Sequence, residues 1–250
     1  MKNVIVPSIS LYENIDDGFL KMLNAYFMYI DNEAEQNHTS WEKHYVKNGN
    51  ITSKAHSFLE PIIAFQNILI NQQRKNLKGD ICEFGCYTGI SSAKLSLLSN
   101  MLNLNFYVFD SFEGLPNIKE YGSEKQNNIY QSGEYCASIE IVRKNIKKFG
   151  IIKNVNLVKG WFSETLKNYK EVKTISHAFI DVDLCKSLEE CLEYILPKLE
   201  SGGIIFSHEA TDPDYPPVFE KYGLLNKENF DSFGVGTGIQ GTEICMFIKK

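Results

Sequence analysis

The stretch GDICEFGCYTGISSAKLS, residues 79–96, decides the fold. A short apolar run at 80–84 passes through two glycines into residues 90–102, where apolar side chains recur at helical spacing. Glycines at such a junction let backbone N–H groups approach a ligand, and a helix N-terminus favours anionic groups. The junction therefore predicts a nucleotide-type ligand. A plain tight turn is the alternative, because the spacing E-x-G-x-x-x-G is not the dinucleotide fingerprint.

Short apolar runs alternate with helical patterns through the rest of the chain. The further runs lie at 105–109, 154–158, 177–180 and 202–206, and the further helical stretches at 138–148 and 187–199. This alternation predicts an α/β fold with a doubly wound, Rossmann-like and mostly parallel sheet. A last run at 242–250 has no helix after it and is predicted to be an antiparallel closing strand. The glycine-rich residues 234–243 are typical of a turn between antiparallel strands, with contact to substrate phosphates as the alternative.

The first 78 residues have a different pattern, which predicts a helical N-terminal cap or extension before a ligand-binding domain at 79–250. Residues 16–36 and 57–75 carry apolar side chains at helical spacing. The polar residues 37–56 between them are either a lid or substrate loop, or a surface connection. The extension could also supply a contact for a homo-oligomer.

The composition excludes several classes of protein. The net charge of −5 does not favour nucleic-acid or anionic-membrane partners, and the basic residues of 142–154 are interpreted as a solvated helix face. The six cysteines form no C-x-x-C pair, which favours free thiols in a reducing compartment. No apolar run approaches the roughly 20 residues of a membrane span. We therefore expect a cytoplasmic protein.

Polar and aromatic residues follow each predicted strand at the edge where ligands bind in such sheets. Asp110 follows the second run, about 20 residues beyond the glycines, where a carboxylate holds a ribose diol. Gly160, Trp161, Phe162 and Ser163 follow the third run and are predicted to border an adenine ring. The alternatives are a turn aspartate and a Trp-Phe pair that belongs to the core.

Four stretches together resemble the macrocin, mycinamicin and novobiocin O-methyltransferase family: GDICEFGCYTGISSAKLS, FYVFDSFEGLP, LVKGWFSETL and AFIDVDLCKSLEECLEYILPKLESGGIIF. The resemblance spans about residues 79–209, and DSFEGLP and DVDLxxS are its specific motifs. It implies a class I methyltransferase that uses S-adenosylmethionine and a divalent metal on sugar or phenol hydroxyls. It also implies the cofactor contacts: Glu83, Gly85 and Gly89 at the methionine end, Asp110 at the ribose, and Trp161 to Ser163 at the adenine. Ser111 is a further expected cofactor-binding residue.

The ends of the fourth and fifth runs predict the catalytic site. Asp181, His208 and Glu209 are expected to converge on one cation, where the family has three carboxylates. The imidazole shifts the preference from magnesium toward manganese, iron or zinc, and leaves the identity of the metal open. The alternative is that His208 and Glu209 start a loop and bind no metal.

The resemblance implies that Asp183 is the general base beside Asp181. The alternatives are a helix cap for Asp183, and Lys186 or His56 as the base.

The resulting expectation is an O-methyltransferase acting on a sugar. The acceptor is expected to be nucleotide-linked and destined for a surface polysaccharide or a glycosylated natural product. The alternatives are a phenolic or catechol acceptor, and a non-catalytic nucleotide-binding protein of the same fold. A nicotinamide dehydrogenase is a weaker alternative, based only on the Y-x-x-x-K letters from Tyr121 to Lys125.

Overall fold

The computed structural model describes residues 22–23, 25–30, 33, 56–208, 210–239 and 242–250. The lid or surface loop predicted at 37–56 therefore lies outside the described residues, apart from the backbone of its last residue. Within the described part of the chain, no helix is both long and apolar enough to cross a membrane.

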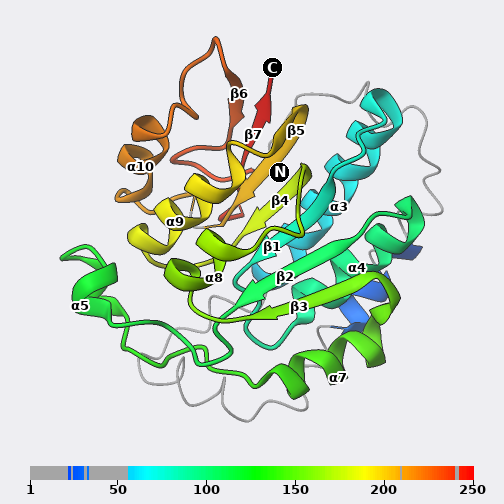
Figure 1. Cartoon of the computed structure of the whole chain (residues 1–250), viewed down its shortest axis with the longest axis horizontal. Helices are drawn as coiled ribbons and strands as arrows, with labels where there is room; N and C mark the ends of the chain where they lie inside the picture. The colour runs from blue at the N-terminus through cyan, green and yellow to red at the C-terminus, as the bar shows by residue number, and fades with distance from the viewer. Residues whose placement is uncertain (1–21, 24, 31–32, 34–55, 209, 240–241) are drawn as a thin grey trace, which may run out of the picture.

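A seven-stranded sheet forms the centre of the molecule (Figure 1). Its strands are β1 (Asp80–Phe84), β2 (Phe106–Asp110), β3 (Val155–Lys159), β4 (Ile175–Ile180), β5 (Leu199–Ser207), β6 (Phe230–Phe233) and β7 (Cys245–Lys249). The strand order is β3-β2-β1-β4-β5-β7-β6, and β1 to β5 are parallel. β7 runs antiparallel to both β5 and β6. The predicted sheet and its antiparallel closing strand are confirmed, whereas β6 was not predicted.

Helices cover both faces of the sheet (Figure 1). One face carries α3 (His56–Lys75), α4 (Ile90–Leu102) and α7 (Ile139–Phe149), and the other carries α8 (Phe162–Asn168), α9 (Cys185–Ile195) and α10 (Tyr215–Lys221). Each layer buries its own apolar cluster against the sheet. The core of the first layer includes Phe65 of α3, so this helix shares a core with the sheet. The helix predicted at 187–199 begins at Cys185 and ends at Ile195, because residues from Leu199 onward belong to β5.

The strand order reverses between β1 and β4, which is where ligands bind in open α/β sheets. The long connection after β2 lies near this edge and carries two short helices, α5 (Ile118–Tyr121) and α6 (Gln126–Ile129). Leu115 and Ile118 of this connection bury themselves against Leu184, which follows β4. A third, smaller apolar cluster therefore joins the connection to the edge of the sheet.

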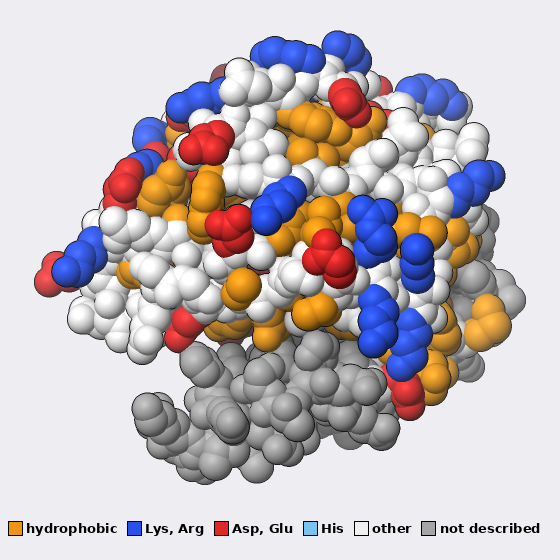
Figure 2. Space-filling view, turned by 60° about the horizontal axis from the view of Figure 1, so that its bottom comes forward, with side chains coloured by type: hydrophobic (Ala, Val, Ile, Leu, Met, Phe, Trp, Pro, Cys, Tyr) orange, Lys and Arg blue, Asp and Glu red, His pale blue; other side chains and the backbone are white. Residues whose placement is uncertain are grey.

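The basic stretch of α7 faces solvent, as predicted. Val142, Ile146 and Phe149 are buried against the sheet layer, whereas Arg143 and its neighbouring lysines are exposed. Figure 2 shows these cations gathered on one face of the molecule. The amphipathic spacing of α7 explains the pattern, because apolar side chains at i, i+4 and i+7 line a single helix face.

Candidate active site

The glycine loop joins β1 to α4 under tight steric constraint. Gly85 has a φ of +78°, and a Cβ atom there would lie 1.8 Å from the carbonyl oxygen of Asp181. Gly89 also has a φ of +78°, and its Cβ would lie 2.6 Å from a methyl carbon of Val142 in α7. Both positions therefore require glycine. The loop consequently lies against the turn that follows β4 on one side and against α7 on the other.

Glu83 is buried at the end of β1 beneath this loop. The Ser92 hydroxyl donates a hydrogen bond to its Oε2, and its Oε1 has no partner among the described residues. Burial raises the pKa of Glu83 to about 8, against the opposing effect of the Ser91 and Ser92 hydroxyls. A buried carboxyl oxygen without a partner suits a cationic ligand group, such as the ammonium of an amino acid.

Asp110 ends β2 with both carboxylate oxygens held by backbone. Its Oδ2 accepts a hydrogen bond from the Cys86 N–H at 2.8 Å, and its Oδ1 accepts one from the Phe112 N–H at 2.6 Å. Burial raises the pKa of Asp110, and these N–H groups oppose the shift. Because a carboxylate has about four acceptor positions, the held group can still accept hydrogen bonds from a diol.

The remaining predicted cofactor residues lie on the segments that directly follow β2 and β3. The Gly160 N–H donates to the Asp110 carbonyl oxygen at 3.0 Å, and Trp161 is the N-cap residue of α8. Phe162 packs edge-on against Phe84 and contributes to the core, as the alternative interpretation allowed. Ser111 donates to the Gly114 carbonyl oxygen, so its hydroxyl stabilises the DSFEGLP turn. Ser163 is half-buried in the first turn of α8.

Asp181 and His208 meet at the ends of β4 and β5. The Nδ1 atom of His208 lies 3.5 Å from Oδ1 of Asp181, and both side chains are partly accessible. Two ligands about 2.1 Å from one ion lie at most about 4.2 Å apart, so the two side chains fit a shared cation. Glu209, the third predicted ligand, lies outside the described residues. Among the residues that the structure does describe, no group of three metal-ligating side chains is found.

Asp183 lies on a sharp turn rather than on an extension of β4. Its φ is +59°, and the Leu184 N–H donates to the Val182 carbonyl oxygen at 2.6 Å. The turn therefore redirects Asp183 away from the strand direction that Asp181 follows. Lys186, an alternative base, forms an ion pair with Glu120 at 2.9 Å. The hydrogen bond that Lys186 donates to Glu120 raises the pKa of Lys186, which keeps it protonated and unsuited to accept a proton.

The residues of the Y-x-x-x-K match do not form a dyad. Tyr121 donates its hydroxyl hydrogen bond to Glu190 at 3.3 Å, whereas Lys125 pairs with Asp212 at 3.1 Å. The two side chains thus engage different elements. This arrangement gives the dehydrogenase interpretation no support from these two residues.

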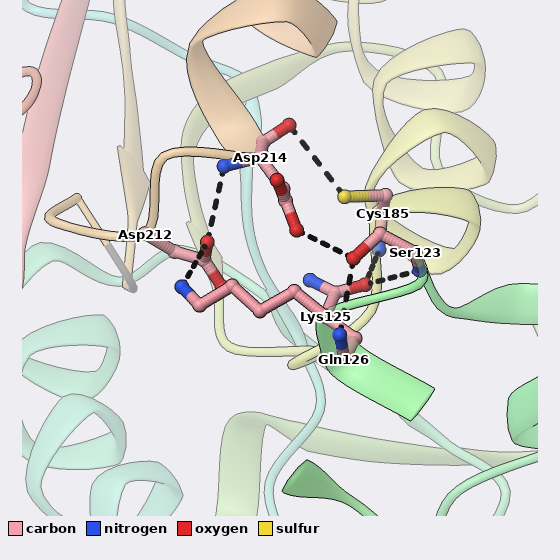
Figure 3. Close-up of polar contacts among 6 residues, drawn as sticks. All are labelled: Ser123, Lys125, Gln126, Cys185, Asp212 and Asp214. Carbon is pink, nitrogen blue, oxygen red and sulfur yellow. Dashed lines mark hydrogen bonds and ion pairs between the residues drawn. The ribbon is translucent and has the colours of Figure 1, made fainter. Parts of the chain in front are cut away.

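A network of polar side chains that the sequence did not reveal joins the β2 connection to the loops after β4 and β5 (Figure 3). Its members are Ser123, Lys125, Gln126, Cys185, Asp212 and Asp214. The sequence could not indicate it, because its partners lie from 29 to 91 residues apart across different elements. Asp212 and Asp214 thus connect the loop after β5 to the β2 connection, and Asp214 is also the N-cap residue of α10.

The sequence model of the macrocin-O-methyltransferase (TylF) family matches residues 12–213. The chain belongs to this family. A relative from Streptomyces olivaceus, an 8-demethyl-8-(2,3-dimethoxy-alpha-L-rhamnosyl)-tetracenomycin-C 4'-O-methyltransferase, is 27% identical over 169 residues. The match covers 64% of this chain and spans 64% of the length of that relative.

Solved methyltransferase structures share the fold of this family member. The O-methyltransferase NovP superposes with a TM-score of 0.65 at 20% identity, covering 76% of this chain and 80% of its own. The calicheamicin methyltransferase CalS11 superposes with a TM-score of 0.61 at 17% identity. The superposition covers 94% of this chain and 93% of CalS11. Its apo structure is described as that of a TDP-rhamnose 3'-O-methyltransferase. These likenesses confirm the Rossmann-like methyltransferase fold.

Proposed function

We propose that this protein transfers a methyl group from S-adenosylmethionine to a hydroxyl group of a sugar. The observation that carries the proposal is that the polar side chains at the ends of β1 and β2 lie at the same edge of the sheet as those at the ends of β4 and β5. The buried Glu83 and the backbone-held Asp110 end β1 and β2, and Asp181 with His208 ends β4 and β5. In a member of the macrocin-O-methyltransferase family, this arrangement supports a cofactor site next to an acceptor site.

The cofactor half binds by charge and hydrogen bonding. The free Oε1 of Glu83 would accept a hydrogen bond from the ammonium of the methionine moiety, and Asp110 would accept from the ribose hydroxyls. When bound, S-adenosylmethionine supplies a methyl group on a sulfonium, which is a good leaving group. The chain must then hold the acceptor oxygen in line with that methyl group, at a near-attack distance of about 3–3.5 Å.

The acceptor half must favour loss of the hydroxyl proton. Asp183 is the proposed base, because it lies at the centre of a turn two residues after Asp181. A divalent cation held by Asp181 and His208, with Glu209 as a third ligand, would supply the Lewis acidity that makes a sugar hydroxyl more acidic. Mixed nitrogen and carboxylate ligands favour manganese or iron over magnesium.

The substrate class follows from the named relatives together with the metal chemistry. One relative is named for a rhamnosyl compound and one neighbour for TDP-rhamnose. A sugar diol offers two adjacent oxygens to a cation. We therefore propose a nucleotide-linked deoxysugar as the acceptor. The methylated sugar would be a building block of a surface polysaccharide or of a glycosylated natural product. A catechol presents the same pair of oxygens and is the second candidate acceptor.

The test measures cofactor binding by calorimetry, followed by methyl transfer from labelled cofactor. The acceptor panel contains TDP-rhamnose, other nucleotide sugars, free sugars and catechols, each with manganese, with magnesium or with chelator. We expect transfer to a nucleotide sugar that requires metal. Asp181→Asn and His208→Ala should each reduce the rate at least about tenfold, and the control Asp231→Asn, on exposed β6, should not.

Three results would argue against parts of this proposal. Labelling of catechols alone would replace the sugar with a phenolic acceptor. Full activity of Asp181→Asn in chelator would remove the metal from the mechanism. Cofactor binding without transfer to any acceptor would favour a non-catalytic nucleotide-binding protein.

A further inference from the structure

The turn that presents Asp183 adopts a backbone conformation that is costly for a residue with a side chain. The hydrogen bond from the Leu184 N–H to the Val182 carbonyl closes a three-residue turn, with Asp183 at its centre and a φ of +59°. A non-glycine residue in such a conformation costs about 1–3 kcal/mol and persists only where its surroundings enforce it. The residues around Asp183 must therefore hold the turn in place.

Apolar packing holds both flanks of the turn. Val182 is buried in the cluster between the sheet and α9, whereas Leu184 is buried in the separate cluster with Leu115 and Ile118. Asp183 therefore lies between two anchors that belong to different cores. The second anchor depends on the connection after β2, which supplies Leu115 and Ile118.

Gln126 of α6 holds the end of the same turn through a hydrogen bond. Its side chain is fully buried, and its Oε1 accepts from the Ser123 N–H at 3.1 Å and from the Cys185 N–H at 3.2 Å. Cys185 is the first residue of α9, and its N-cap residue, Leu184, has no polar side chain to cap the helix. A side chain 59 residues away therefore accepts from the first N–H group of α9.

The two N–H donors also fix the orientation of the Gln126 amide, because only its oxygen can accept from them. Its Nε2 then has no hydrogen-bond partner among the described residues. This buried, unsatisfied donor costs about 1–3 kcal/mol, whereas an apolar side chain of similar size would leave the N–H groups of Ser123 and Cys185 without their acceptor. The role of the amide at this position is therefore carried by its oxygen, which holds the two N–H groups.

The neighbouring residues extend the connection to the loop after β5 (Figure 3). The Ser123 hydroxyl donates to Asp214 Oδ2 and accepts from the Gln126 N–H at 3.1 Å. Asp214 belongs to the loop that begins with His208. The short segment from Ser123 to Gln126 therefore contacts both loops that carry the proposed catalytic groups.

We infer that Gln126 is a positioning residue that holds the Asp183 turn by accepting the hydrogen bond of the Cys185 N–H. This inference rests on the proposed function, in which Asp183 is the base. Gln126 touches neither substrate nor cofactor in this role. It acts by restricting the position of the Asp183 carboxylate, and a displacement of about 1 Å at a reacting group can cost about 100-fold in rate.

The test compares Gln126→Met, which keeps the volume and removes the acceptor, with Gln126→Glu, which keeps an acceptor oxygen. Gln72→Met is the matched control, because Gln72 is a partly buried glutamine of α3 whose Nε2 donates to the Leu77 carbonyl, away from the site. We expect Gln126→Met to lower kcat at least tenfold while the Kd for the cofactor stays unchanged. Gln126→Glu should restore most of kcat, and Gln72→Met should leave it unchanged.

Coupling to Asp183 separates a positioning role from a structural one. In the Asp183→Asn background, Gln126→Met should slow the residual reaction less than twofold, because the group that it positions is already lost. An equal loss in both backgrounds would overturn the inference.

Hydrogen exchange in a peptide that covers Leu184 and Cys185 gives a readout that does not depend on activity. Exchange should be faster in Gln126→Met than in the wild type or in Gln72→Met, and unchanged exchange would overturn the inference. If the wild type transfers no methyl group to any acceptor, the proposed function fails, whereas the exchange result still decides whether Gln126 holds the turn.

Discussion

The carboxyl group of Glu83 shows how one residue links cofactor binding to stability. Its pKa of about 8 in the folded protein lies above the ordinary value of 4.5. The folded state therefore keeps a proton that the unfolded state releases. The contribution of Glu83 to stability is therefore complete below about pH 4.5 and is lost as the pH rises toward 8.

Replacing Glu83 with glutamine should remove this loss. Without cofactor, we expect Glu83→Gln to be more stable than the wild type at pH 8, with the difference vanishing near pH 4.5. Urea unfolding at a series of pH values measures this. The same variant should bind S-adenosylmethionine about 10- to 100-fold more weakly, because an amide cannot release a proton on binding and become a charged partner for the ammonium. Identical pH profiles for variant and wild type would show that the carboxyl is not neutral in the folded state.

Two strand-end residues of the candidate site, Asp181 and His208, lie at one edge of the sheet, as the sequence predicted. The proximity of Asp181 and His208 could be predicted, because parallel strands end at a shared edge and each residue directly follows an apolar run. Gln126 could not be found in this way. Its partner Cys185 is 59 residues away, and a single glutamine in a polar stretch has no local signature.

At the scale of elements, periodicity predicted the strands because their burial is strong. β1 and β4 are buried along nearly their whole length, and both appear as apolar runs. β6 was missed because only Phe230 of its four residues is buried, as expected at the edge of a sheet. α9 begins two residues earlier than predicted, because the acceptor for its first N–H group comes from Gln126 rather than from its own N-terminal sequence.

Helix α7 supports the glycine loop, and this role can be separated from its own stability. The Asn145 side chain donates to the Thr88 carbonyl oxygen at 2.8 Å, between the helix and the loop. Ser138 instead caps the helix, where its hydroxyl accepts from the Ile141 N–H. The two residues thus lie on one element and hold different structures.

We expect Asn145→Ala to weaken cofactor binding about tenfold, because the freed loop must be ordered when the ligand binds. Ser138→Ala should cost about 1 kcal/mol of unfolding free energy and leave the Kd for the cofactor nearly unchanged. Calorimetry and urea unfolding of both variants test the distinction. Equal effects on the Kd would mean that α7 influences the loop only through its overall stability.

At the scale of the whole molecule, a buried polar contact joins α3 to the sheet. The Nδ2 atom of Asn71 lies 3.1 Å from Nε2 of His177 in β4, and it also donates to the carbonyl oxygen of Gly202 in β5. The Ser176 hydroxyl lies 2.9 Å from the other ring nitrogen of His177. The imidazole is therefore enclosed between the helix layer and two parallel strands.

This contact should make the molecule sensitive to acid. Burial lowers the pKa of His177 from 6.5 to about 3, so the unfolded state takes up a proton that the folded state excludes. The contribution is complete above about pH 6.5 and is lost as the pH falls toward 3. We expect His177→Gln, which keeps an acceptor for Asn71, to lose less stability than the wild type between pH 7.5 and pH 5. Urea midpoints at the two pH values measure this, and hydrogen exchange should show α3 opening early in the acidified wild type. If the variant and the wild type lost stability equally, the acid sensitivity would have to arise elsewhere in the molecule.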